Sequence, residues 1–248
     1  MQKIVLVTGG SRGIGAATAM LAAKCGYAVA LNYRSDAARA EQVLANVRSS
    51  GVKAIAVQAD ISKEDDIMRL FETVESHLGR LTALVNNAGI LEKQMRVESM
   101  PADRLQRVLA TNVVGTMLCA REAVRRMSTK LGGRGGSIVN VSSMASRLGS
   151  PNEYVDYAAS KGAVDTFTIG LSREVAAEGI RVNAIRPGLI DTEMHASGGE
   201  PARIERLKSG VPMQRGGTAE EAAHAILWLL SDEASYTTGS FIEVSGGR

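Results

Sequence analysis

The sequence has little cysteine, few aromatic residues and no long apolar run. Its 248 residues include two cysteines, Cys25 and Cys119, which are far apart and form no Cys-x-x-Cys pair. We therefore expect neither a disulfide framework nor a metal site, and a reducing cytoplasm fits this usage best. No apolar stretch approaches the roughly 18 residues that cross a membrane, and the first strand starts too early for a signal sequence. The composition thus predicts a protein that is neither secreted nor membrane-spanning.

An excess of charge of one sign is absent too. Lysine and arginine total 29 against 26 acidic residues, a net charge of +3, and the basic residues are scattered along the chain. Nucleic-acid binding is therefore not expected. With 45% hydrophobic and 22% charged residues, the chain has the composition of an ordinary globular protein. An α/β protein of this length is often one domain, so we expect residues 1–248 to form a single unit.

Apolar runs of strand length alternate with longer helical patterns. Strands are expected at about 3–8, 27–32, 53–58, 81–86, 136–142, 180–186 and 239–244. Helices are expected at about 13–25, 36–50, 63–79, 101–130, 153–179 and 218–231. This alternation predicts a doubly wound, Rossmann-type α/β fold, with a parallel sheet of about seven strands and helices on both faces. The long irregular segment 187–217, with a short helix near 202–208, should form a substrate lid.

A glycine-rich turn follows the first expected strand. Within Lys3–Gly15, an apolar run breaks into glycines and then enters an alanine-rich helical segment. Gly9, Gly13 and Gly15 would let a pyrophosphate approach the backbone, and the unpaired N–H groups at the helix N-terminus favour an anion. The spacing Gly-x-x-x-Gly-x-Gly differs from the more familiar Gly-x-Gly-x-x-Gly of dinucleotide sites. Taken alone, the turn is weak evidence for a nucleotide site.

A tyrosine and a lysine stand four residues apart within the expected helix 153–179. Tyr157 and Lys161 therefore project from one helix face, with the phenol next to the ammonium. A neighbouring cation favours the phenolate, so the lysine would lower the tyrosine pKa and allow proton exchange at cellular pH. A half-buried tyrosine beside a surface lysine is the structural alternative.

Together the two motifs resemble those of the short-chain dehydrogenase/reductase family, and the resemblance extends over nearly the whole chain. In sequence order, the matching positions are Thr8-Gly-Gly-Ser-Arg-Gly-Ile-Gly15, Asp60-Ile61, Asn86-Asn87-Ala88-Gly89, Asn112, Ser143, Tyr157-x-x-x-Lys161 and Pro187-Gly188. Ser143 precedes Tyr157 by 14 residues, one more than is commonest in the family. The resemblance implies a Rossmann-type fold, a nicotinamide cofactor and hydride transfer.

The resemblance assigns catalytic roles to Asn112, Ser143, Tyr157 and Lys161. Ser143 and Tyr157 would hydrogen-bond the substrate carbonyl oxygen while nicotinamide delivers hydride, and Tyr157 would give up its proton. Lys161 would lower the tyrosine pKa and hold the nicotinamide ribose. Asn112, inside the expected helix 101–130, would bend the backbone, leave a carbonyl free and join a water relay to Lys161. An ordinary helix-surface asparagine is the alternative.

The end of the second expected strand bears on the choice of cofactor. An NAD enzyme would place an acidic residue there for the ribose 2′-hydroxyl, but this chain has Asn32, Tyr33 and Arg34. Arg34 and Arg12 would grip a 2′-phosphate by charge-assisted hydrogen bonds, so NADP(H) is favoured over NAD(H). Solvated surface arginines are the alternative. Asp60 resembles the family's acceptor for the adenine amino group, or it caps the following helix.

The resemblance implies a cofactor site that combines the glycine turn, three strand ends and the start of the lid. Pro187, Gly188, Ile190 and Thr192 resemble the family's segment that contacts the nicotinamide carboxamide. The full membership of the expected cofactor site is Gly9, Ser11, Arg12, Gly13, Ile14, Gly15, Asn32, Tyr33, Arg34, Asp60, Ile61, Asn87, Ala88, Gly89, Tyr157, Lys161, Pro187, Gly188, Ile190 and Thr192.

These observations predict an NADP(H)-dependent oxidoreductase that acts on a small carbonyl compound or secondary alcohol. Two alternatives stay open. One is a 3-oxoacyl-[acyl-carrier-protein] reductase, whose acidic carrier would meet Arg125, Arg126 and Arg173. The other is a non-catalytic NADP(H)-binding sensor. The resemblance also implies a homotetramer packed through helices 101–130 and 153–179. Substrate identity depends on loop residues, for which the candidates are Met144, Leu148, Tyr154, Met194 and His195.

Overall fold

Seven strands form one fully parallel sheet in the computed structural model, which describes residues 2–248. The strand order is β3-β2-β1-β4-β5-β6-β7. The strands are β1 (Ile4–Val7), β2 (Ala28–Tyr33), β3 (Ala54–Gln58), β4 (Ala83–Asn86), β5 (Gly136–Val141), β6 (Ile180–Pro187) and β7 (Phe241–Val244). The expected doubly wound parallel sheet is confirmed.

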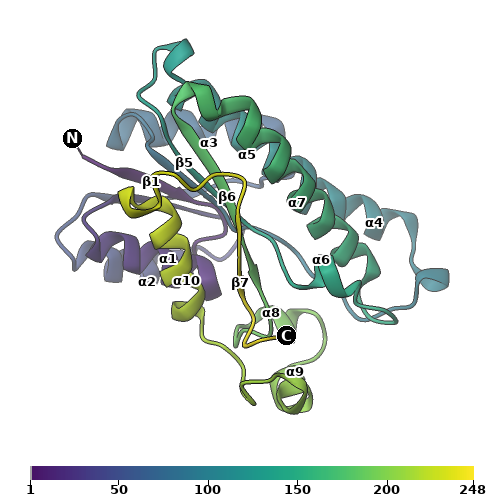
Figure 1. The fold of residues 1–248 in the computed structure, drawn as a ribbon. Coiled ribbons are helices and arrows are strands. Elements are labelled where there is room, and N and C mark those ends of the chain that lie inside the picture. Colours follow the sequence, from purple (N-terminus) through teal and green to yellow (C-terminus); the bar gives the residue numbers. More distant parts are fainter. Residues whose placement is uncertain (1) are drawn as a thin grey trace.

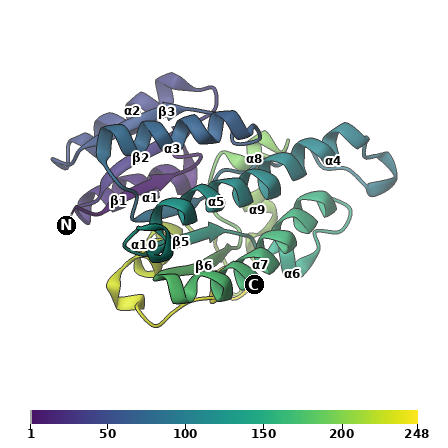
Figure 2. The ribbon, with the colours of Figure 1, turned by 90° about the horizontal axis from the view of Figure 1, so that it is seen from above.

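Helices cover both faces of the sheet (Figures 1 and 2). One face carries α1 (Gly13–Lys24), α2 (Ala37–Arg48) and α10 (Ala219–Leu230), and the other carries α3 (Glu64–Leu78), α5 (Thr116–Met127) and α7 (Val155–Val175). Each face has its own apolar core. Successive residues of β2 alternate between the two cores, with Val29 and Leu31 in one and Ala28 and Ala30 in the other. Because both faces are buried, the strands are continuous apolar runs.

Small residues bring α1 close to the sheet. Its sequence is rich in alanine and glycine, and its residues from Gly15 to Ala19 are buried. A Cβ on Gly15 would lie 2.3 Å from the carbonyl oxygen of Gly9, so a larger residue would push the helix off the turn. On the same face, Thr218 and Glu221 form a capping box that fixes the start of α10.

The structure departs from the expected elements in two places. The continuous helix expected at 101–130 is wrong, because a π-helical segment, η2 (Ala110–Gly115), separates α4 (Ala102–Leu109) from α5. The expected loops also contain short helices, α6 (Ala145–Leu148) and α8 (Met194–Ser197). The short helix expected near 202–208 is confirmed as α9 (Arg203–Leu207). Single 3₁₀ turns complete the chain at η1 (Val97–Ser99), η3 (Thr129–Leu131), η4 (Ala176–Glu178), η5 (Lys208–Gly210) and η6 (Asp232–Ala234).

The helices of residues 2–248 were also compared with the requirements of a membrane span. None of them is both long enough and apolar enough to cross a bilayer.

Candidate functional site

A cleft of about 750 Å³ opens at the carboxyl ends of the strands, beside the point where the sheet order reverses between β1 and β4. Open α/β sheets bind ligands at this position, because the connections from neighbouring strands diverge there. Every residue expected in the catalytic or cofactor site lines the cleft, except Gly15 and Asn112. The five candidate substrate residues, Met144, Leu148, Tyr154, Met194 and His195, line it as well.

The glycine-rich turn forms one wall of the cleft. Gly9 has a φ of +63°, and a Cβ there would lie 2.9 Å from the Cα of Ala88, so the turn requires glycine at this position. The Asn87 amide donates to the carbonyl oxygens of Thr8 and Gly9 at 2.9 and 3.0 Å. These bonds tie the end of β4 to the turn. Gly15 supports the turn from behind and does not line the cleft.

Asn32 and Asp60 lie at the ends of β2 and β3. The buried Asn32 side chain accepts from the Gly9 N–H at 3.2 Å and donates to the Ala59 carbonyl at 2.9 Å, so it braces the turn against the strand ends. One Asp60 carboxylate oxygen accepts from the backbone N–H and the hydroxyl of Ser62. The start of α3 has no side-chain cap, so the alternative role of Asp60 as a helix cap is wrong.

Two exposed arginines, Arg12 and Arg34, line the end of the cleft that is formed by the glycine turn and the ends of β2 and β3. The guanidinium of Arg12 lies 3.5 Å from the hydroxyl of Ser197 in α8, and Arg34 follows β2. Within residues 2–248, neither arginine forms an ion pair with a carboxylate. Both guanidinium groups are therefore available to an anion, which is the property that a 2′-phosphate site requires.

Tyr157 and Lys161 lie on one face of α7 at the other end of the cleft. The Lys161 Nζ is 5.6 Å from the centroid of the Tyr157 ring and donates to the Val141 carbonyl at 2.7 Å. Ser143 follows β5, and its hydroxyl is a hydrogen-bond partner that lowers the pKa of Tyr157. The same hydroxyl accepts from the Ala145 N–H at the start of α6. Phenol, hydroxyl and ammonium thus lie at the same end of the cleft.

Burial governs the titration of this pair. Loss of solvent raises the pKa of Tyr157 to about 12, despite the hydrogen bond from Ser143. Loss of solvent also lowers the pKa of Lys161 to about 8, partly offset by the negative charge of Asp165. The expectation that Lys161 lowers the Tyr157 pKa is therefore wrong for the protein by itself. The reason is that burial dominates the pKa of Tyr157, while the Lys161 ammonium donates to the Val141 carbonyl.

Asn112 lies fully buried within η2, where the helix widens. Its side chain accepts from the Ile90 N–H at 2.8 Å and donates to the Ile90 carbonyl and the Ser160 hydroxyl. Its own carbonyl accepts from the Thr116 hydroxyl at 2.9 Å, which occupies one of the two lone pairs of that oxygen. The expected distortion of the helix is present, and π segments often occur at functional sites. Asn112 links the strand-end loop to α7 through Ser160.

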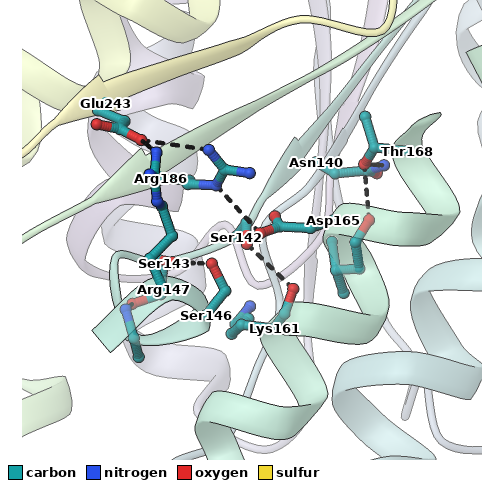
Figure 3. A network of polar contacts seen from close by, with 12 residues as sticks. Asn140, Ser142, Ser143, Ser146, Arg147, Lys161, Asp165, Thr168, Arg186 and Glu243 are labelled. Atoms are coloured by element: carbon teal, nitrogen blue, oxygen red, sulfur yellow. Dashed lines mark hydrogen bonds and ion pairs between the residues drawn. The ribbon is translucent and has the colours of Figure 1, made fainter. Parts of the chain in front are cut away.

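A polar network holds the elements around Ser143 and Lys161 together (Figure 3). Arg186 of β6 pairs with Asp165 of α7 at 3.1 Å and with Glu243 of β7 at 3.2 Å. Glu243 also pairs with Arg147 of α6. Asp165 lies one helical turn after Lys161, so the network reaches the lysine through an electrostatic interaction. It fixes α6 and α7 against the end of the sheet.

The segment 187–217 places the carboxylate of Glu193 beside the glycine turn. Nothing in the sequence predicted a carboxylate at this place. Glu193 forms an ion pair with Arg39 of α2, and its Oε2 lies 4.0 Å from the position that a Cβ on Gly13 would take. The two paired residues are 154 positions apart, and neither belongs to a motif. Only the folded chain reveals that this segment reaches across the turn.

The arginines considered for carrier binding are on the opposite edge of the sheet from the cleft. Arg125 and Arg126 lie near the end of α5, which leads to the start of β5, and both pair with Glu122. Arg173 is exposed near the end of α7.

As to metals, no three His, Cys, Asp or Glu side chains gather into a possible ligand set within residues 2–248.

Comparison with known proteins agrees with this geometry. A family model described as enoyl-(acyl carrier protein) reductase matches residues 9–248. The chain is 63% identical over 245 residues to the uncharacterized oxidoreductase YgfF of Escherichia coli strain K12, with 99% of each chain covered. The chain belongs to the short-chain dehydrogenase/reductase family. It is therefore an oxidoreductase of that family, as the resemblance implied.

Two further relatives carry informative descriptions. The chain is 39% identical over 246 residues to glucose 1-dehydrogenase 2 of Bacillus subtilis strain 168, covering 99% of this chain and 94% of that one. A crystal structure of a short-chain dehydrogenase from Burkholderia cenocepacia J2315 in complex with NADP superimposes with a TM-score of 0.90 at 33% identity. That likeness covers 99% of this chain and 97% of the other.

Proposed function

We propose that this member of the family is an NADP(H)-dependent oxidoreductase that interconverts a carbonyl compound and a secondary alcohol. The convergence of Ser143, Tyr157 and Lys161 at one end of the cleft is the observation that supports it most. A hydroxyl pair beside a buried lysine can hold a carbonyl oxygen and exchange a proton with it.

The residues of the cleft fit a nicotinamide dinucleotide phosphate. At the glycine turn, Gly9 and Gly13 have positive φ and no side chain, so the backbone at the start of α1 is open to a pyrophosphate. Arg12 and Arg34 supply cations without competing ion pairs, which favours a 2′-phosphate over a 2′-hydroxyl. The likeness to a relative solved with NADP supports the same choice.

Each polar group at the reacting end has a distinct task in this proposal. The cofactor, when bound, supplies or accepts the hydride. Ser143 and Tyr157 bind the substrate oxygen, and Tyr157 donates the proton during reduction or accepts it during oxidation. Lys161 holds the ribose and provides positive charge when protonated. Asn112 positions α7 and the loop at Ile90, and would organise water near Lys161.

The two alternatives differ from this proposal in what they require. A carrier-protein reductase gains support from the description of the matching family model. It loses support because Arg125 and Arg126 are engaged by Glu122 and lie away from the cleft of the same chain. A non-catalytic sensor would tolerate the loss of a catalytic residue, whereas all four expected residues are present.

We also propose a homotetramer with two-fold axes. Apolar side chains are exposed along α4, η2, α5 and α7, namely Leu105, Leu109, Val114, Met117 and Ile169. Such a row costs free energy in water unless another chain covers it.

The test of the proposed function replaces Tyr157 by phenylalanine. Tyr157→Phe should lower kcat by about 100- to 10,000-fold and leave the Kd for NADPH unchanged, because only the proton donor is removed. Tyr154→Phe is the matched control and should retain turnover, since the Tyr154 hydroxyl bonds the Gly198 carbonyl. Retention of more than about a tenth of wild-type turnover in Tyr157→Phe would contradict the assignment.

A further inference from the structure

The part of the cleft beyond Ser143 and Tyr157 is lined mainly by apolar side chains. These come from the loop after β4, from α6 and its flanks, and from the segment 187–217, and they are Leu91, Met144, Leu148, Tyr154, Leu189 and Met194. Met144 and Leu189 are almost fully buried in the wall, and Leu91, Leu148 and Met194 remain partly open to the cleft. A substrate that enters here replaces water on an apolar surface.

The charged groups of the wall of this region, those of Glu153, Glu200, Arg203 and Arg206, already have partners. Arg203 is 11% exposed, pairs with Glu153 and with Glu200, and lies 5.1 Å from the centroid of the Tyr154 ring. Glu153 and Glu200 each pair with Arg206 as well. The four charges therefore satisfy one another and offer no free cation or anion to a ligand.

The remaining polar side chains of this region are few, namely Ser150, Tyr154, His195 and Arg248. The Nε2 of His195 bonds the Ile190 carbonyl at 2.9 Å, and burial lowers the histidine pKa, so the ring is neutral at pH 7. Its Nδ1 is buried without a partner. The Tyr154 hydroxyl donates to the Gly198 carbonyl. Arg248 is exposed at the rim, beside the turn at Gly188 that packs on Ser245.

We propose that the substrate is a neutral carbonyl compound with apolar substituents, or the matching secondary alcohol, and not a polyol, a sugar or a keto acid. This inference rests on the proposed function and specifies its substrate class. Apart from Ser143 and Tyr157, this wall offers a polar ligand only the Nδ1 of His195, the Ser150 hydroxyl and, at the rim, Arg248. Most hydroxyls of a polyol would therefore lose water without gaining a partner. A substrate carboxylate in this part of the cleft would likewise find the guanidinium of Arg203 already paired.

The test compares three open-chain, six-carbon secondary alcohols with NADP⁺ as the cofactor. These are 2-hexanol, sorbitol and 5-hydroxyhexanoate, which differ in hydroxyl number and charge but not in chain length. NADPH formation should give a kcat/KM for 2-hexanol at least about tenfold above those for the other two. A preference of less than tenfold, or a preference for sorbitol or 5-hydroxyhexanoate, would overturn the substrate class and leave the hydride-transfer function standing.

A binding measurement further separates the proposed hydride-transfer function from the proposed apolar substrate class. If none of the three alcohols is oxidised, the proposed function fails, and the thermal unfolding of the NADP⁺-loaded protein then tests the pocket alone. A rise in Tm with 2-hexanol but not with sorbitol or 5-hydroxyhexanoate supports the apolar pocket. Any other pattern, including no rise with any alcohol, overturns it.

Met194 gives a matched pair of variants, because glutamine and leucine have nearly its size. Met194→Gln should raise the KM for 2-hexanol by about three- to tenfold through the loss of apolar contact, with little change in kcat. Met194→Leu should stay within about twofold of the wild type. Equal KM values for the two variants would contradict the assignment of this surface to the substrate.

Discussion

Lysine 161 is expected to cost the folded protein stability at neutral pH. Its side chain is 4% exposed, and burial lowers its pKa from 10.5 to about 8. Each pH unit of difference between folded and unfolded states is worth about 1.4 kcal/mol, so charging the buried amine at pH 7 costs about 3 kcal/mol. Replacement by methionine, which has a similar length and no charge, removes this cost.

The same substitution also removes a hydrogen bond. The Lys161 Nζ donates to the Val141 carbonyl at 2.7 Å, and leaving that buried oxygen without this donor costs about 1–3 kcal/mol. The net expectation for Lys161→Met at pH 7 is a gain of about 0–2 kcal/mol in the free energy of unfolding, together with loss of turnover. A residue kept for chemistry would then be unfavourable for folding.

The pH dependence isolates the electrostatic part of this effect. Between about pH 8 and 10.5 the unfolded chain keeps the lysine proton that the folded chain has lost, so the wild type gains stability as the pH rises. From pH 7 to pH 9.5 the wild type should gain about 2 kcal/mol relative to Lys161→Met. Urea unfolding followed by circular dichroism at both pH values and one protein concentration measures this change.

The exposed Lys63 provides the control for this experiment. Lys63→Met should change the free energy of unfolding by less than about 0.5 kcal/mol at either pH. If wild type and Lys161→Met differ in the free energy of unfolding by the same amount at pH 7 and pH 9.5, the charge of Lys161 does not destabilise the folded state. That result would refute the reasoning.

Three further outcomes are expected. Arg34→Asp should lower the preference for NADPH over NADH by about 10- to 100-fold in kcat/KM, because a cation is exchanged for a repelling carboxylate; an unchanged ratio would exclude a contact with the 2′-phosphate. Asp165→Asn should lower the Lys161 pKa further, since the carboxylate raises it, and the alkaline loss of kcat should therefore move to lower pH. An unchanged pH profile of kcat would show that the charge of Lys161 is not required. Leu109→Arg, on the exposed face of α4, should reduce the molar mass found by light scattering, whereas a wild-type monomer at micromolar concentration would contradict the tetramer.

The sheet and the motif positions were predictable from local sequence. Strands such as β1 are buried on both faces and therefore form continuous apolar runs that alternate with long helical patterns. Motif residues at strand ends, such as Gly9 and Ser143, must then meet at one edge of a parallel sheet. The spacing of Tyr157 and Lys161 fixes their common helix face in the same way.

The short helices and the Glu193 contact were not predictable in this manner. Helix α6 has four residues, too few for an apolar period to show. Glu193 is one of several acidic residues in an irregular segment, and it acquires its place beside Gly13 only through packing with α2. The pKa of Tyr157 was also mispredicted, because burial raises it, and the burial of this side chain depends on the packing of the whole fold.

The break in the helix expected at 101–130 has a tertiary cause. Asn112 was expected to bend this helix, and Thr111, Val113, Val114 and Gly115 are weak helix formers, but the sequence alone does not specify a π segment there. The π segment instead brings the Asn112 amide to both backbone groups of Ile90, and a Cβ on Gly115 would lie 2.4 Å from the Ile61 carbonyl. Both partners belong to strand-end loops at the cleft edge of the sheet. The helix is therefore distorted where it crosses these loops, which makes the distortion a consequence of the site that the loops form.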